Sequence, residues 1–370
     1  MRWLTFGTYN VHSHPRVGVL IEGLRASGDE VVEVNEPLRL STAGRVAMLR
    51  QPWRLPVLVG KLLRCWALLV LRARRARRSG PSDAVLVGYL GHFDVRLARL
   101  LFRRTPIVLD HLVSAAGTAR DRGLAGSSGL KARLMRWIDD GALRRADLVV
   151  VDTQEHLAEL PGYAAGKAVV APVGATQEWF ALGSQPRPAG QGEPLRVIFV
   201  GLYTPLHGTR TIGAALAALA GDQQIAVTMV GTGQEYAACR AAAAGNTTIQ
   251  WLDWVPAGEL PALVAAHDVS LGIFGTTAKA RNVVPTKVYQ GAAAGLAVVT
   301  SDTAPQRAAL GDAAVLVPPG DPEALAAALH RLAKDREELR RYQRAAHDRA
   351  VQSYRPASVV AGIRARVQTG

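Results

Sequence analysis

Residues 269–300 read VSLGIFGTTAKARNVVPTKVYQGAAAGLAVVT, and this stretch decides the fold. The apolar run Val269 to Phe274 predicts a buried strand, and Leu296 to Thr300 predicts the next one. Pro285 suits the first turn of a helix, and Gly295 suits the C-terminal cap of that helix. The stretch therefore predicts a strand, a polar loop, a short helix and a returning strand, as in parallel α/β sheets.

Three cations lie around the start of this helix. Lys287 falls in the first turn, where the positive end of the helix dipole disfavours a cation. Lys279 and Arg281 lie just upstream in the polar loop. Such a gathering favours a bound anion, most simply a phosphate or a diphosphate, although a solvated basic loop is the alternative.

The same alternation of strand and helix patterns extends in both directions along the chain. The other segments that predict strands are 3–9, 30–34, 84–88, 106–110, 148–152, 195–200, 225–230, 248–252 and 314–317. Residues 181–194 interrupt the pattern with three prolines and three glycines, which predicts a linker. We expect two α/β domains, residues 1–180 and 195–350, followed by a terminal segment, 351–370.

The composition is that of a globular protein, with 49% hydrophobic and 20% charged residues among 370. The two cysteines, Cys65 and Cys239, lie far apart in sequence, which argues against a disulfide framework or a metal cluster. No signal peptide precedes the first predicted strand, so a cytoplasmic location is expected. The net charge of +14 is not accompanied by a recognisable nucleic-acid-binding motif.

Much of the positive charge lies in residues 39–78, which hold 11 basic residues and no acidic one. Within them, residues 55–71 are mostly apolar and contain Trp66, but they also carry Lys61 and Arg64, and five arginines follow between Arg72 and Arg78. The segment is too short and too charged to span a bilayer. Residues 55–78 therefore indicate a helix that lies on an anionic membrane surface, or else a core helix with a solvated basic end.

Two glycine-rich loops follow predicted strands in the second domain. Residues 201–208 read GLYTPLHG, and residues 231–235 read GTGQE. Glycines at such positions let phosphates approach backbone N–H groups, although tight turns also require glycine. Together with the basic loop, they favour a nucleoside diphosphate at the carboxyl edge of the sheet.

The chain resembles the GT-B glycosyltransferases of family 4. The residues that carry the resemblance are 200–208, 230–235, 285–290 and 311–325. The resemblance implies two Rossmann-like doubly wound domains that face each other across a cleft. It also implies that the first domain binds the acceptor, that the second binds the donor, and that the terminal segment returns to the first domain.

The resemblance also implies roles for individual residues. The family's two glutamates would fall on Asn282 and Gln290, whose amides can bind sugar hydroxyls but supply no negative charge. His111 ends a strand and would contact the donor sugar, or it caps the turn. The candidate catalytic residues are His111, Lys279 and Lys287. The candidate donor-binding residues are Gly201, His207, Gly208, Gly231, Gly233, Arg281, Asn282, Pro285, Thr286 and Gln290. The candidate acceptor-binding residues are Tyr9, Asn10, His12, Arg16 and Asp110, with Asp121 and Arg122 beyond them.

The resemblance implies a retaining enzyme that moves a hexosyl-type sugar from a nucleoside-diphosphate sugar to an acceptor hydroxyl. The acceptor is lipid-linked, a polysaccharide or a small molecule. We expect no metal, no cofactor and no nucleic-acid partner, and a protein that is either free in the cytoplasm or peripheral on the inner face of the membrane. A non-catalytic sugar-nucleotide-binding subunit and a nucleotide-sugar epimerase are the alternatives.

Overall fold

The computed structural model describes residues 1–11, 14–38, 55–89, 91–112, 114–115, 117, 129–183 and 192–369. The chain divides into two compact units. The first contains Met1–Asp152, Leu157–Ala171 and Val360–Gly370, and the second contains Thr153–His156 and Pro172–Val359. The division after Ala171 comes earlier in the chain than the expected linker at 181–194.

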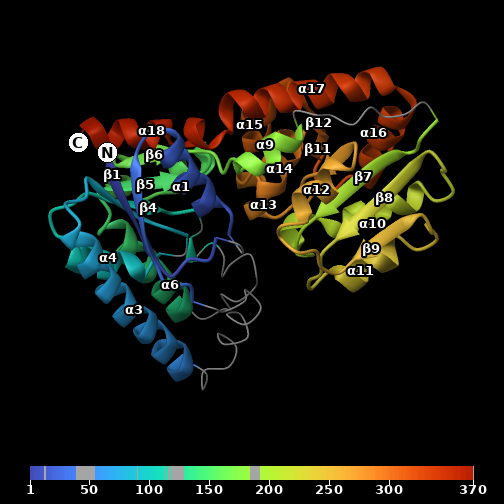
Figure 1. The fold of residues 1–370 in the computed structure, drawn as a ribbon. Helices are drawn as coiled ribbons and strands as arrows, with labels where there is room; N and C mark the ends of the chain where they lie inside the picture. The colour runs from blue at the N-terminus through green and yellow to red at the C-terminus, as the bar shows by residue number, and fades with distance from the viewer. Residues whose placement is uncertain are drawn as a thin grey trace. The chain divides into compact units, whose positions relative to one another are not determined.

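The first unit is built on a parallel sheet with the strand order β2-β1-β3-β4-β5-β6 (Figure 1). Its strands are β1 (Arg2–Gly7), β2 (Glu30–Asn35), β3 (Ala84–Val87), β4 (Ile107–Asp110), β5 (Leu148–Val151) and β6 (Ala168–Val170). Its helices are α1 (Arg16–Ala26), α3 (Leu55–Arg78), α4 (Asp94–Leu101), α6 (Gly129–Leu143) and α8 (Gly162–Ala165). The short helix α7 (Gln154–Ala158) lies where the chain passes between the units.

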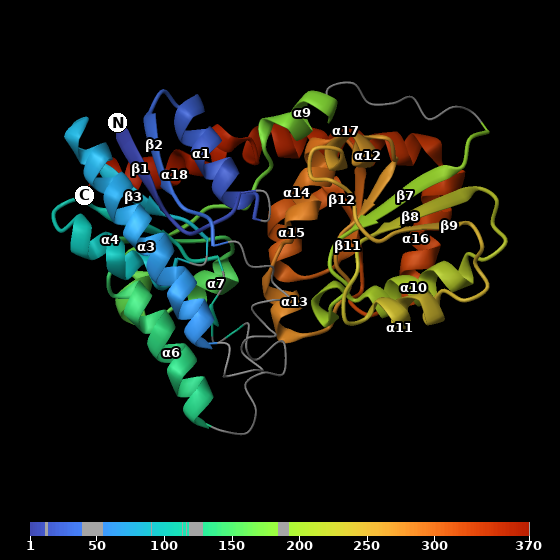
Figure 2. The same cartoon turned by 60° about the horizontal axis from the view of Figure 1, so that its bottom comes forward.

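The core of the first unit explains why its strands are apolar runs. Every residue of β3, β4 and β5 is buried, as expected for parallel strands covered on both faces. Leu69 of α3, Ala98 of α4 and Leu143 of α6 belong to one cluster with these strands. The three helices therefore cover the same face of the sheet, as Figure 2 also shows.

The second unit has a parallel sheet with the order β12-β11-β10-β7-β8-β9. Its strands are β7 (Leu195–Val200), β8 (Ile225–Val230), β9 (Ile249–Leu252), β10 (Val269–Leu271), β11 (Ala297–Ser301) and β12 (Ala314–Val317). Its elements of helix are α9 (Gln177–Gly183), η2 (Pro205–His207), α10 (Thr209–Ala218), α11 (Tyr236–Ala242), α12 (Leu260–Ala265), α13 (Ala278–Asn282), α14 (Thr286–Ala293), α15 (Ala304–Leu310), η3 (Gly311–Ala313), α16 (Pro322–Lys334) and α17 (Arg336–Ser353). The last helix, α18 (Pro356–Thr369), spans the division between the units.

Each sheet contains a switch point, where the order of the strands along the chain reverses. In the first sheet β1 pairs with both β2 and β3, and in the second β7 pairs with both β8 and β10. Ligands of doubly wound folds bind beyond the carboxyl ends of the strands at such points. We therefore expect a ligand site at the loops after β7 and β10.

The carboxylate of Asp29 holds the end of the chain on the first unit. It accepts hydrogen bonds from the Nε of Arg364 in α18 at 2.7 Å and from the indole N–H of Trp3 at 3.1 Å. Burial by itself would raise the pKa of Asp29, but the hydrogen bonds from Arg364 bring that pKa below its ordinary value. The folded state therefore favours the ionised form of Asp29 more strongly than the unfolded state does.

We expect Asp29→Asn to lower the free energy of unfolding by about 1–3 kcal/mol at pH 7, because a guanidinium loses its charged partner. A folded-state pKa below the unfolded one gives stability that is present at neutral pH and is lost as pH falls through the folded-state pKa. Urea unfolding at several pH values should therefore show the two proteins converging in acid. A difference in free energy of unfolding between the two proteins that stays constant down to pH 2 would contradict this account.

Candidate active site

The loops at the switch point of the second sheet are packed backbone against backbone. Gly208 has φ +62°, and a Cβ there would lie 2.4 Å from the carbonyl carbon of Phe274. A Cβ on Gly275 would lie 2.3 Å from the carbonyl oxygen of Pro205. Only glycine fits both positions, so the loops after β7 and β10 come into direct contact.

The loop after β8 closes on the same place. Gly231 has φ +115°, and a Cβ on it would lie 2.0 Å from the carbonyl oxygen of Gly201. A Cβ on Gly233 would lie 2.6 Å from the backbone nitrogen of Tyr203. The glycines expected to bind the donor thus all lie at one edge of the sheet, where each also allows two loops to pack together.

Lys287 is buried beside these loops. Its side chain leaves the first turn of α14, and the ammonium nitrogen Nζ lies 3.8 Å from the ring centre of Phe199. A Cβ on Gly201 would be only 2.6 Å from this Nζ, so the ammonium occupies the space that a side chain on Gly201 would fill. Nζ has no hydrogen-bond partner among the described residues, and burial lowers the pKa of Lys287 well below its ordinary value.

His207 lies close to Lys287 and is not a cation at neutral pH. Its pKa is well below the ordinary value, first because the ring is desolvated and then because Lys287 and Lys279 repel a second charge. The ring nitrogen Nδ1 lies 3.2 Å from the hydroxyl of Thr204. A neutral imidazole can donate one hydrogen bond to a phosphate but adds no positive charge.

The polar loop expected before α14 contains the short helix α13, which the sequence analysis did not predict. Thr277 caps this helix by accepting a hydrogen bond from the N–H of Ala280 at 3.2 Å. Lys279 is half-buried on it, whereas Arg281 is exposed. The carbonyl of Asn282 accepts a hydrogen bond from the hydroxyl of Thr153 at 2.9 Å.

The expected boundary of α14 shifts by one residue. Pro285 is the N-cap in an extended conformation, and Thr286 is the first helical residue. Gln290 lies one turn further and lines, together with Lys287, a cavity of about 10 Å³. That volume suits about one water molecule, so this cavity is not the expected donor pocket.

In the first unit, three of the residues expected to bind the acceptor are turned into the protein. The Arg16 guanidinium donates a 2.7 Å hydrogen bond to the Asp110 carboxylate, and both side chains are almost fully buried. Tyr9 is 3% exposed and donates its hydroxyl hydrogen to Thr5 at 3.0 Å. These side chains hold the carboxyl edge of the sheet together, and their expected role in binding an acceptor stays a prediction.

The remaining first-unit candidates are placed differently. Asn10 is half-buried, and its carbonyl accepts a hydrogen bond from the N–H of His14 at 2.9 Å. His12, Asp121 and Arg122 lie outside the described residues.

His111 directly follows β4 and is buried next to two residues that the sequence analysis missed. Its ring centre lies 5.4 Å from that of His92, which follows β3. The Nε2 of His92 lies 3.0 Å from a carboxylate oxygen of Asp139 in α6. These three side chains could hold a metal ion, because one ligand atom from each lies within 4.8 Å of the others. No spacing in the sequence signals this cluster.

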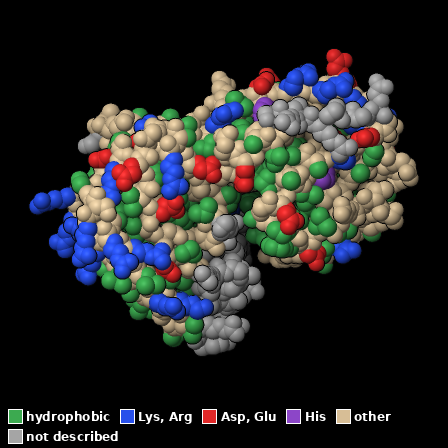
Figure 3. Space-filling model, in the orientation of Figure 1, with side chains coloured by type: hydrophobic (Ala, Val, Ile, Leu, Met, Phe, Trp, Pro, Cys, Tyr) green, Lys and Arg blue, Asp and Glu red, His purple; other side chains and the backbone are tan. Residues whose placement is uncertain are grey.

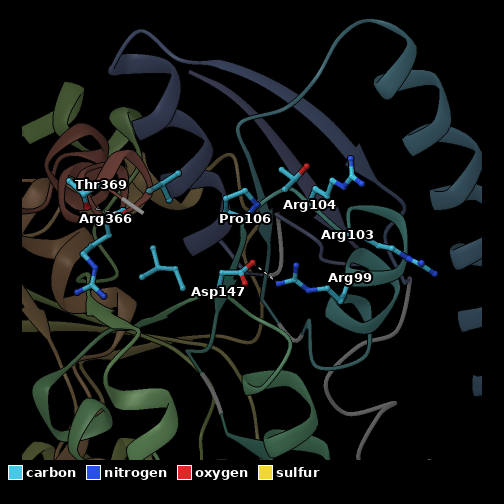
Figure 4. Close-up of a pocket in the computed structure, with 10 residues that line it drawn as sticks. Arg99, Arg103, Arg104, Pro106, Asp147, Arg366 and Thr369 are labelled. Atoms are coloured by element: carbon cyan, nitrogen blue, oxygen red, sulfur yellow. Dashed lines mark hydrogen bonds and ion pairs between the residues drawn. The ribbon is translucent and has the colours of Figure 1, made fainter.

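A separate hollow of about 550 Å³ lies on the first unit at the opposite edge of the sheet (Figure 4). It lies beside Pro106 and Asp147, which immediately precede β4 and β5. Arg99 crosses it to bind Asp147 at 2.5 Å, and Arg103, Arg104 and Arg366 add positive charge to the rim. Because this hollow lies at the amino ends of the strands, it is distinct from the carboxyl-edge site.

The expected surface helix forms as one continuous helix, α3, with both apolar and basic side chains exposed. Val57, Val59, Leu63 and Leu71 are each more than half exposed. Trp66, by contrast, donates its indole N–H to Asp94 at 2.8 Å and so lies on the packed face. Across the described residues, no helix is both long and apolar enough to cross a membrane.

Comparisons with known proteins agree with this architecture. Residues 194–335 match the protein-family model described as "Glycosyl transferases group 1". None of the curated proteins matches the chain in sequence.

Several solved structures are similar to the chain along its length. Sucrose-phosphate synthase from Thermosynechococcus elongatus has 15% identity and a TM-score of 0.69, covering 100% of this chain and 98% of that chain. HepE from Anabaena in complex with UDP-glucose has 15% identity and a TM-score of 0.67, covering 100% of both chains. The α,α-trehalose 6-phosphate synthase from Burkholderia multivorans has 14% identity and a TM-score of 0.62, covering 100% of this chain and 98% of that chain. The likeness confirms the expected GT-B fold with its two Rossmann-like domains.

Proposed function

Because residues 194–335 are a glycosyltransferase group 1 domain on a GT-B fold, we propose that the chain transfers a sugar with retained anomeric configuration. The donor is a nucleoside-diphosphate sugar, and the acceptor is a hydroxyl of a lipid-linked, polysaccharide or small-molecule substrate. UDP-glucose is the first donor to test, because the similar HepE structure contains it.

The ammonium of Lys287 is the observation that carries this proposal. It belongs to a buried lysine whose Nζ makes no hydrogen bond within the described residues, next to a glycine at the switch point, and burial disfavours its charged form. An unpaired buried ammonium is costly for a folded protein, so the site favours a ligand that brings negative charge. A diphosphate supplies that charge, and the surrounding glycine-rich loops let its oxygens approach the backbone.

The proposed chemistry follows from this placement. When the anomeric C–O bond of the donor breaks, negative charge develops on the leaving diphosphate, and Lys287 and Lys279 stabilise it. Neutral His207 donates a hydrogen bond to the same group. The acceptor hydroxyl transfers its proton to the leaving phosphate oxygen, so the step relies on protein cations and requires no metal ion.

The test is a thermal-shift panel of UDP, GDP, ADP and dTDP with the full-length protein. At 100 times its Kd, the cognate nucleotide should stabilise the protein by about 2.7 kcal/mol. Gly201→Ala should remove most of this shift, because the new Cβ would displace the Lys287 ammonium from its place 2.6 Å away. Gly258→Ala is the matched control, because nothing lies within 4 Å of a Cβ there, and it should keep the full shift.

If no nucleotide stabilises the wild type, or if Gly201→Ala responds as fully as Gly258→Ala, this donor site is wrong. With the cognate donor, hydrolysis or transfer by the isolated protein separates an enzyme from a non-catalytic binding subunit. The anomeric proton coupling of the product, measured by NMR, then distinguishes retention from inversion.

We also propose that the first unit binds peripherally to anionic membranes through α3 and the neighbouring α4 and α6. Leu100 of α4 and Leu134 and Trp137 of α6 are at least half exposed, like the apolar residues of α3. Figure 3 shows Lys and Arg side chains gathered on this part of the first unit. Exposed apolar side chains beside dense positive charge are typical of surfaces that lie in the headgroup region of a bilayer.

Replacing Arg74, Arg75 and Arg78 together by glutamine tests this membrane surface. All three are exposed, whereas Arg72 pairs with Glu36 and Arg77 donates to the carbonyl of Leu101. Each arginine near an anionic surface contributes about 1 kcal/mol, so sedimentation with vesicles containing phosphatidylserine should weaken by about 100-fold.

The control variant makes the same change of net charge, but on the second unit. Arg340, Arg341 and Arg344 on α17 are also exposed, and their replacement by glutamine should leave vesicle binding unchanged. Equal losses in the two triple variants would mean that net charge, and not this surface, drives the binding. Equal binding to neutral and anionic vesicles would also contradict the proposal.

A further inference from the structure

Three buried side chains from distant parts of the first unit meet at the carboxyl edge of its sheet. His92 follows β3, His111 follows β4 and Asp139 lies in α6, and each is no more than 8% exposed. One potential ligand atom from each lies within 4.8 Å of the other two. Two imidazoles and one carboxylate at this spacing make a set of ligands that first-row transition metals prefer.

The geometry between His92 and Asp139 is unusual for a simple ion pair. The Nε2 of His92 lies 3.0 Å from the Oδ1 of Asp139, yet this nitrogen makes no hydrogen bond to the described residues. His330 and Asp222 in the second unit are also 3.0 Å apart, and their contact is a regular hydrogen bond. The two pairs therefore share a distance but differ in direction, because the His92 nitrogen is not aimed along the line to the oxygen.

A common metal ion accounts for this difference. Two ligand atoms that each lie about 2.1 Å from a shared ion are about 3.0 Å apart at right angles and about 3.4 Å apart at the tetrahedral angle of zinc sites, and both point at the ion. A buried ring nitrogen that lacks a hydrogen bond costs about 1–3 kcal/mol when nothing else occupies its lone pair. Coordination removes that cost.

The carboxylate of Asp139 is oriented for this task by its neighbours. Its Oδ2 accepts a hydrogen bond from the hydroxyl of Ser114, and its Oδ1 accepts one from the backbone N–H of Ala115, both at 2.8 Å. Outer hydrogen bonds of this kind fix metal-binding carboxylates and tune their affinity.

We propose that His92, His111 and Asp139 bind one divalent transition-metal ion of the Zn²⁺ class. Three protein ligands leave at least one position open to water or another ligand. The assignment gives His111 a role as a metal ligand in place of the sugar contact that the sequence resemblance implies. The ion would clamp the segments that follow β3 and β4 to α6, and the proposed transfer step does not depend on it.

The experiment uses untagged full-length protein, stripped with EDTA and titrated with Co²⁺ as a spectroscopic probe. Binding of one Co²⁺ per chain should produce visible d–d absorption, which one equivalent of Zn²⁺ then abolishes. His92→Gln should weaken Co²⁺ affinity by about 100-fold or more, and Ser114→Ala by about 10–100-fold, the range for losing an outer hydrogen bond. As a control, His330→Gln removes the histidine of the His330–Asp222 pair in the second unit, and this variant should bind Co²⁺ like the wild type.

Circular dichroism and thermal melting check that each variant folds. If His92→Gln does not fold, Ser114→Ala still tests the proposal. Absence of d–d absorption in the wild type would show that His92 and Asp139 form an ordinary pair, and the proposal would fail. It would also fail if folded His92→Gln and Ser114→Ala bound Co²⁺ as tightly as His330→Gln. Because every readout is metal binding, this result is independent of nucleotide binding at Lys287.

Discussion

Lys287→Met is expected to stabilise the unliganded protein while abolishing its response to the cognate nucleoside diphosphate. Methionine has a similar length and fills the same space against Phe199 without a buried charge. Because the ammonium makes no hydrogen bond within the described residues, its removal should raise the free energy of unfolding by about 1–3 kcal/mol. Chemical denaturation and the nucleotide thermal shift measure the two effects separately.

The pH dependence of stability provides a second measure of the same residue. The folded-state pKa of Lys287 lies well below its ordinary value because the side chain is buried. Between those two pKa values the unfolded state binds the extra proton, so the wild-type free energy of unfolding rises with pH. Lys287→Met should lack this rise.

Lys167 offers the matched control for this substitution. It is a half-buried lysine of the first unit whose pKa is also lowered by burial, but its Nζ donates to the carbonyl of Ala146 at 2.5 Å. Lys167→Met should therefore give no gain in stability and should keep the nucleotide response. If Lys287→Met destabilises the protein and retains the full nucleotide thermal shift, the Lys287 ammonium is not part of a phosphate-binding site.

Arg16→Met is expected to cost about 3–5 kcal/mol of stability, because it leaves the Asp110 carboxylate buried without its partner. Arg25 provides the control, since it lies on the same helix and pairs with Glu33 at the same distance, 2.7 Å, but both side chains are exposed. Arg25→Met should cost less than 1 kcal/mol. Urea unfolding of both variants tests this contrast directly.

The double variant Arg16→Met/Asp110→Leu should recover much of the loss, because neither charge is then buried alone. Burial already raises the pKa of Asp110, an effect that Arg16 only partly opposes. Without Arg16 the folded state should bind a proton more readily than the unfolded state. The loss in Arg16→Met should therefore shrink as pH falls, and a loss that grows in acid would contradict this interpretation.

The positions of most strands along the chain were predictable because each buried parallel strand is a short apolar run. The runs at 195–200, 225–230 and 314–317 coincide with β7, β8 and β12. The edge strand β6 (Ala168–Val170) was missed, because three residues are too few for a periodic signal. Helix α13 was missed because Pro285 follows it so closely that the segment was read as a loop.

The positions of the candidate site residues were easier to predict than the directions of their side chains. Sequence placed Lys287 in the first turn of a helix, but its burial depends on the missing side chain at Gly201, far away in the chain. The ion pair of Arg16, expected only as an acceptor-binding residue, was not predicted because its partner, Asp110, lies 94 residues further on. The contact between His92 and Asp139 likewise joins two elements whose packing no local pattern encodes.

The way α18 returns to the first unit has a consequence for biosynthesis. Arg364 binds Asp29, so the first unit includes a piece of chain that is synthesised after the second unit. A nascent chain that has just emerged through Ala171 lacks this piece, whereas residues 172–359 emerge as one uninterrupted block. The second unit can therefore fold as soon as it has emerged from the ribosome, whereas the first unit is complete only after the segment that contains Arg364 has followed it.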